Sequence, residues 1–99
     1  MNLQDHVLQQ LLKVPRGKVT TYRDLAHAVN TRAYRAVGQA LKNNSHPIEV
    51  PCHRVIKSTG EVGGYAGYST SDKKARLLKK EGVTIKNGRI DLDQFGYRF

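Results

Sequence analysis

The chain contains a single cysteine, Cys52, which is followed directly by His53 and Arg54. A thiolate is a strong nucleophile, and positively charged neighbours favour the thiolate over the thiol. A lone free cysteine is more commonly a buried, unreactive small hydrophobic residue. Here the basic neighbours and the rigid Pro51 before the cysteine favour a reactive nucleophile held in one place.

A cysteine next to a histidine can also indicate acyl transfer, as in a cysteine protease. The segment from Ile48 to Ile56 is apolar and extended in character, but it is broken by Pro51 and the Cys-His-Arg triplet. On an extended segment adjacent side chains point to opposite faces. His53 would then reach Cys52 only through a water molecule or a local helical turn. A chain of 99 residues also lacks the size for a protease groove, so capture of an alkyl group by the sulfur is the better interpretation.

The balance of charge points to a polyanionic partner. Seventeen Lys and Arg against eight Asp and Glu give a net charge of +9, which is typical of nucleic-acid binding, although a basic surface that only confers solubility is the alternative. No apolar stretch is long enough to span a membrane, and no signal peptide is evident. We therefore expect a cytoplasmic, nucleoid-associated monomer, nuclear in a eukaryote.

Neither a disulfide nor a cofactor is expected. One cysteine cannot form an internal disulfide, and the four histidines show no spacing typical of metal ligands. The fold must be stable without either, and any chemistry must come from the side chains themselves.

Four helices are expected to position these residues. The apolar periodicity predicts helices over 3–14, from Tyr22 onward with Thr21 as N-cap, over 32–43, and over 69–81 with Gly82 as the C′ residue. Asn87-Gly88 predicts a β-hairpin between 83–86 and 89–92. The aromatic tail, with Phe95, Tyr97 and Phe99, is expected to dock on the domain.

The second and third helices together have the form of a helix-turn-helix. In the third, one face is apolar and small (Ala33, Ala36, Val37, Ala40 and Leu41), and the other is polar and basic (Arg32, Arg35, Gln39 and Lys42). The predicted fold is mostly α with a small β-hairpin, a winged helix-turn-helix-like single domain spanning 1–99.

The chain resembles the DNA-binding, active-site domain of the O6-alkylguanine-DNA alkyltransferases. The stretches TTYRDLA, YRAVGQALKNN, HPIEVPCHRVI, STGEVGGYAG and LLKKEG occur in the order and spacing of that family. They cover roughly residues 3–85. The resemblance implies direct-reversal DNA repair without a cofactor: a guanine bearing an O6-alkyl group is flipped out of duplex DNA, and its alkyl group passes irreversibly to the cysteine.

The same resemblance implies the catalytic roles. Cys52 would be the nucleophile, and His53 would deprotonate it through a water molecule. Glu81 would orient the imidazole, and Asn44 would brace the turn before the active-site segment. From the residues alone, Glu81 could equally be a solvated residue before Gly82, and Asn44 an ordinary turn residue.

The resemblance also implies a DNA surface and a substrate pocket. Arg35 would enter the base stack in place of the extruded guanine, and Tyr22 would turn the target phosphate, although Tyr22 could simply be a core aromatic. The pocket would use the carbonyls of Cys52 and Val55, with Tyr65, Ala66 and Gly67 around the alkyl group. The small residues Ala36 and Gly38 would let the third helix lie close in the minor groove. The basic residues Arg32, Lys42 and Arg54 could contact phosphates. Solvation of Arg32 and Lys42, and an internal salt bridge of Arg54, are the alternatives.

Two features differ from the alkyltransferase pattern. Ala66 stands where serine is common, and the tail RIDLDQFGYRF is similar to that of alkyltransferase-like proteins, which bind alkylated DNA without repairing it and usually carry Trp in place of the cysteine. A non-catalytic binder that flips alkylated guanine is therefore the alternative function, and a sequence-specific winged-helix regulator is a third.

Overall fold

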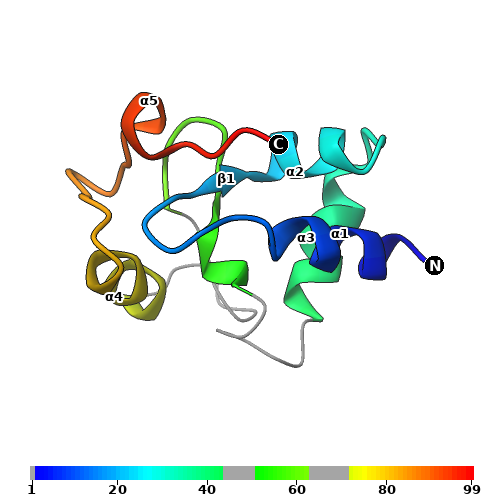
Figure 1. The fold of residues 1–99 in the computed structure, drawn as a ribbon, viewed down its shortest axis with the longest axis horizontal. Helices are drawn as coiled ribbons and strands as arrows, with labels where there is room; N and C mark the ends of the chain where they lie inside the picture. The colour runs from blue at the N-terminus through cyan, green and yellow to red at the C-terminus, as the bar shows by residue number, and fades with distance from the viewer. Residues whose placement is uncertain (1, 44–50, 63–71) are drawn as a thin grey trace.

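The computed structural model describes residues 2–43, 51–62 and 72–99, and Figure 1 shows the order of its elements. Two strands, β1 and β2, are two residues long each, and η1 is a single 3-10 turn. The elements in chain order are α1 (Leu3–Leu11), β1 (Thr20–Thr21), α2 (Tyr22–Ala28), α3 (Tyr34–Lys42), η1 (Cys52–Arg54), β2 (Val55–Ile56), α4 (Asp72–Lys80) and α5 (Leu92–Phe95).

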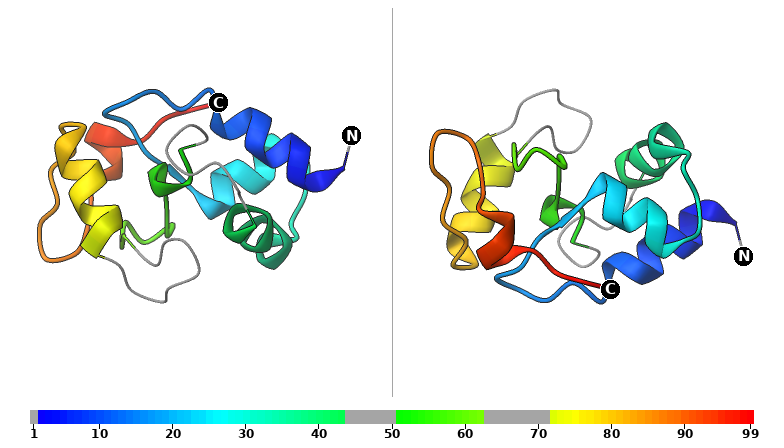
Figure 2. Two further views of the ribbon diagram at one scale, coloured as in Figure 1. Left: turned by 90° about the horizontal axis from the view of Figure 1, so that it is seen from below. Right: turned by 90° about the horizontal axis from the view of Figure 1, so that it is seen from above.

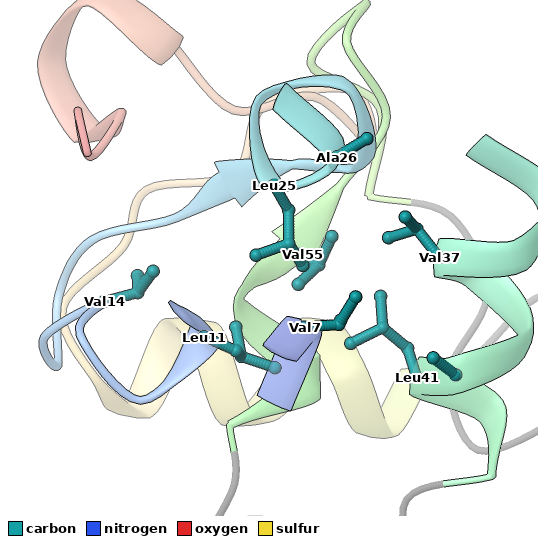
Figure 3. Packing of buried hydrophobic residues seen from close by; sticks show 9 residues of the cluster. Val7, Leu11, Val14, Leu25, Ala26, Val37, Leu41 and Val55 are labelled. Carbon is teal, nitrogen blue, oxygen red and sulfur yellow. The ribbon is translucent and has the colours of Figure 1, made fainter. Parts of the chain in front are cut away.

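Helices α1, α2 and α3 enclose the first of two hydrophobic clusters (Figure 3). The helices pack pairwise, and each contributes the buried side chains of its apolar stripe. Val55 of β2, directly after the turn that carries Cys52, completes the cluster. The fully or nearly fully buried members are Val7, Leu11, Val14, Leu25, Ala26, Val37, Ala40, Leu41 and Val55.

The strand pair lies between the two clusters. β1 and β2 are parallel, with Thr20 opposite Val55 and Thr21 opposite Ile56. Because successive side chains of a strand point to opposite faces, Val55 enters the first cluster and Ile56 enters the second. Helices α4 and α5 lie on the far side of the strands from α1–α3 (Figure 2). This arrangement fixes η1, which leads directly into β2, at the junction of the two halves.

The C-terminal tail docks on the strands, as the aromatic residues predict. Val19 N–H donates to the carbonyl of Phe95 at 2.8 Å, and Tyr97 N–H donates to the carbonyl of Val19 at 2.7 Å. Phe95 is buried in the second cluster. Gly96 is required between them, because a Cβ there would collide with the backbone carbonyl of Leu92.

The predicted caps at the start of α2 and at the end of α4 are confirmed. Thr21 Oγ1 accepts from Asp24 N–H at 3.0 Å and caps α2. Gly82 has a φ of +95°, and Val83 N–H returns to the carbonyl of Leu78 at 3.0 Å, which is the C-terminal cap predicted for α4. Helix α3 begins at its N-cap Ala33 without a side-chain cap, and Thr31 Oγ1 accepts from Ala33 N–H at 3.0 Å just before the helix.

Some boundaries differ from the prediction. Helix α1 ends at Leu11 rather than Val14, and Leu12 is 57% exposed. The predicted turn at Asn87-Gly88 is present, with reciprocal backbone hydrogen bonds of 2.9 Å between Lys86 and Arg89. The strands predicted around it do not form, and the chain continues into α5, which the pattern did not predict. The apolar segment is broken at Cys52–Arg54, as the Cys-His-Arg triplet indicates, by the helical turn η1.

Candidate active site and nucleic-acid interface

The turn η1 presents Cys52 at the edge of the first cluster. Arg54 N–H donates to the carbonyl of Pro51 at 2.9 Å, and Val55 N–H donates to the carbonyl of Cys52. The side chain of Cys52 is partly buried against the cluster and partly exposed. Cys52 is therefore not fully enclosed in the core, and the helical turn removes the opposite-face arrangement of an extended segment.

Glu81 joins His53 to Arg54 behind the turn. His53 is fully buried, and its Nε2 lies 3.1 Å from Glu81 Oε1. Arg54 binds the same carboxylate in a bidentate manner, with Nε 2.9 Å from Oε1 and Nη2 2.6 Å from Oε2. Arg54 Nη1 also donates to the carbonyl of Val14 at 2.8 Å. The internal salt bridge considered for Arg54 is the one observed.

The electrostatics of this group favour a neutral imidazole beside a carboxylate anion. Burial lowers the pKa of His53; the hydrogen bond and charge of Glu81 oppose that change, and the positive charges of Arg54 and Lys74 reinforce it. Burial alone would raise the pKa of Glu81, but hydrogen bonds from Arg54 and His53 outweigh it and lower that pKa. A neutral His53 that donates Nε2–H to Glu81 carries its lone pair on Nδ1 and can take up a proton.

Lys74 is the residue of this site that the sequence analysis missed. It lies on α4 and is fully buried, which is rare for a lysine. Its Nζ is 5.8 Å from the centroid of the Tyr22 ring. Burial lowers its pKa from 10.5 to about 8, opposed by attraction to Cys52 and assisted by repulsion from Lys57. A positive charge therefore lies within electrostatic range of the sulfur.

Tyr22 forms the other side of this environment. It is partly buried against the first cluster, at the first position of α2. Burial raises the pKa of its hydroxyl, and the negative charge of Cys52 raises it further. Elements from both halves of the molecule thus converge on Cys52: α2 with Tyr22 and α4 with Lys74.

Helix α3 carries the predicted DNA-contacting residues on one surface. Val37, Ala40 and Leu41 face the first cluster. Outside it, Arg35 and Lys42 are exposed, as is Arg32 just before the helix, while Ala36 and Gly38 are half-buried. A Cβ added at Gly38 would meet no atom within 4 Å, so the surface beside it is open. The expected basic outer face of the helix-turn-helix is present.

Part of the predicted site lies outside the described residues. This applies to Asn44, Tyr65, Ala66 and Gly67. Val55 is described and fully buried. Across residues 2–43, 51–62 and 72–99, no group of three or more metal-ligating side chains is found. Over the same ranges no helix is long and apolar enough to cross a bilayer.

Three comparisons agree with the geometry. The chain is 42% identical over its whole length to a bifunctional methyltransferase/endonuclease of Picrophilus torridus, of which it covers 32%. It is 48% identical over 84% of its length to the constitutive methylated-DNA–protein-cysteine methyltransferase of Bacillus subtilis, of which it covers 50%. The chain thus spans about a third to a half of the curated relatives it matches.

A solved structure covers the whole fold. S. pombe Atl1, crystallised in complex with damaged DNA containing O6-carboxymethylguanine, superposes with a TM-score of 0.87 at 28% identity, covering 100% of both chains. The profile of the family described as "6-O-methylguanine DNA methyltransferase, DNA binding domain" matches residues 2–83. The chain, with its turn-borne cysteine and its helix-turn-helix, belongs to that family.

Proposed function

We propose that this protein repairs O6-alkylguanine in duplex DNA by a single, irreversible transfer of the alkyl group to Cys52. The observation that carries the proposal is a partly exposed cysteine, with the buried His53 paired to the partly buried Glu81 behind it and a buried cation near it. The methyltransferase names of the relatives support it.

In the proposed step His53 accepts the thiol proton through a water molecule, and Glu81 holds the imidazole in the required orientation. The Cys52 sulfur attacks the alkyl carbon, so that a sulfur–carbon bond forms as the carbon–O6 bond breaks. The guanine leaves as an anion and takes up one proton, which balances the one lost by the thiol. Base flipping brings the alkyl carbon to the sulfur at a cost of a few kcal/mol.

The DNA is held by α3 and by Tyr22 in this proposal. Arg35 replaces the extruded guanine in the stack, and Arg32 and Lys42 contact phosphates. The small residues Ala36 and Gly38 allow the helix to approach the minor groove. The partner is double-stranded DNA, in keeping with the net charge of +9.

The test is the mass of the intact protein after incubation with a duplex containing O6-methylguanine. We expect a gain of one methyl group per chain, and no gain for Cys52→Ser or with the undamaged duplex. A mass that does not change, or a gain that persists in Cys52→Ser, would reject the transfer.

The alternative is a binder that flips the lesion without removing it. The full-length superposition on Atl1 favours this second candidate. It predicts tight binding to the damaged duplex, an unchanged protein mass and a persistent lesion.

Gly38→Ala is expected to separate stability from DNA binding. Alanine in a helix interior stabilises it by about 0.5–1 kcal/mol over glycine, and the added methyl group meets no protein atom. If α3 lies against DNA at this position, the methyl group must weaken binding. Urea unfolding and fluorescence anisotropy with a labelled lesion duplex measure the two effects. A more stable variant with unchanged affinity would move the DNA contact away from Gly38.

A further inference from the structure

A groove of about 580 Å³ adjoins the site and is not used by the proposed transfer step. It lies where the first turns of α2 and α3 meet the turn that follows β2. The lining residues are Tyr22, Arg23, Tyr34, Lys57, Ser58 and Thr59. Tyr22 also contributes to the surroundings of Cys52. The groove and the nucleophile therefore share a wall.

Two cations make the groove positive. Arg23 and Lys57 are both exposed, and within the described ranges neither forms an ion pair with a carboxylate. The Ser58 hydroxyl lies beside Lys57 and can donate a hydrogen bond, whereas the Thr59 hydroxyl donates to the Glu61 carboxylate at 3.1 Å. Such a combination matches a phosphate group, which accepts several hydrogen bonds and carries a negative charge.

Tyr34 gives the groove a flat aromatic surface. Its side chain is 43% exposed. The ring is nevertheless held in place, because its hydroxyl lies 3.1 Å from His27 Nε2 and the two ring centroids are 6.1 Å apart. An exposed ring fixed beside a positive groove suits the stacking of a nucleobase.

We propose that this groove binds the nucleotide next to the flipped one, with its phosphate between Arg23 and Lys57 and its base on the Tyr34 ring. The inference rests on the proposed function, since it takes the flipped base to lie at Cys52. The shared Tyr22 wall then leaves one nucleotide step between the two sites. An acidic peptide would satisfy the cations but leave Tyr34 without a base to stack on it.

The stacking part is tested in the Cys52→Ser background with a labelled duplex containing O6-methylguanine. We expect Tyr34→Ala to weaken binding about five- to fiftyfold, the range for loss of one stacked base, and Tyr34→Phe to change it less than about twofold. When the neighbouring base on one side of the lesion is replaced by an abasic site, Tyr34→Ala should weaken binding no further.

The phosphate part uses charge-neutral DNA. The double variant Arg23→Gln/Lys57→Gln should reduce affinity and lower the salt slope by about 0.9, the value for one phosphate. A methylphosphonate at the flanking position should abolish that difference. The control, Lys13→Gln/Lys79→Gln, removes the same charge from exposed positions on other elements and should show no dependence on the methylphosphonate. A polyglutamate peptide should not compete at concentrations where a short oligonucleotide does.

The groove would be rejected as a nucleotide site if the loss of affinity from each protein variant simply added to the loss from the DNA change, on either side of the lesion. It would also be rejected if polyglutamate competed as well as the oligonucleotide. Because these measurements are binding equilibria, they do not depend on methyl transfer. Coupling between the protein variants and the DNA changes, with no gain in protein mass, would reject alkyl transfer and support the groove as a nucleotide site. A gain in mass without such coupling would support alkyl transfer and reject the nucleotide site.

Discussion

Lys74→Met is expected to slow alkylation of Cys52 about tenfold to hundredfold at neutral pH. Attraction between Cys52 and the Lys74 ammonium raises the pKa of Lys74 against the effect of burial. Because that attraction is mutual, removing the ammonium removes a favourable electrostatic interaction with Cys52. A tenfold to hundredfold change in rate corresponds to about 1.4–2.7 kcal/mol. Methionine keeps an unbranched side chain, one atom shorter, and removes the ammonium group.

The same substitution is expected to stabilise the fold. The pKa of Lys74 falls from 10.5 to about 8 on folding, so below pH 8 its burial costs roughly 3 kcal/mol. Between pH 8 and 10.5 the unfolded chain binds the extra proton, so stability increases with pH there and the cost is gone above 10.5. We expect Lys74→Met to gain about 1–3 kcal/mol at pH 7 and to lose this pH dependence.

Two measurements check these opposite effects. The rate of carboxamidomethylation by iodoacetamide reports on Cys52 alone, since it is the only cysteine, and it requires no DNA. Urea unfolding at pH 7 and at pH 10 gives the stability. Lys73→Met, at the exposed neighbouring position, is the matched control and should change neither. A variant that reacts at the normal rate would remove Lys74 from the machinery of the site.

The burial of Lys74 near Cys52 could not be predicted from the sequence. In a chain with 17 basic residues one more lysine on a helix is by default solvated. Its distance of four residues from the buried Leu78 and seven from Glu81 places all three on one helix face, which is the signal that could have identified it. Spacing alone does not say that this face turns toward Cys52, because that depends on packing between distant segments.

The helix-turn-helix could be predicted because its determinants are local. Thr21 was recognised as the N-cap of α2 from its residue type and position. The small apolar stripe of α3 was recognised from its periodicity, and it packs against the core. The turn at Cys52 could not be predicted, since η1 has neither a periodic pattern nor a side-chain cap. It forms because β2 must pair with β1, a contact between two-residue segments. The association of His53 with Glu81 was implied only by the family resemblance. The sequence did not distinguish a phosphate contact of Arg54 from an internal salt bridge.

Glu81→Gln is expected to cost about 3–5 kcal/mol of stability at neutral pH. The carboxylate holds the buried His53 and the partly buried Arg54, and loss of its charge removes the bidentate ion pair of the Arg54 guanidinium. Breaking a buried ion pair from one side is strongly destabilising, because the remaining charge stays desolvated. Glu61→Gln is the matched control: that carboxylate accepts a hydrogen bond from Thr59 in an exposed turn and should change stability by less than about 0.5 kcal/mol.

The pH dependence gives this prediction its sign. The pKa of Glu81 is lower in the folded protein than its ordinary value, so its stabilising contribution is complete above the unfolded value and is lost as the pH falls through the folded one. Urea titrations between pH 7 and pH 3 should therefore show a steeper loss for the unmodified protein than for Glu81→Gln, with Glu61→Gln following the unmodified curve. Since Glu81 also opposes the lowering of the pKa of His53, the variant that folds at pH 7 should leave His53 a weaker base and slow any proton transfer from Cys52. Parallel titration curves, with a small loss at pH 7, would mean that solvent rather than Glu81 balances the charge of Arg54.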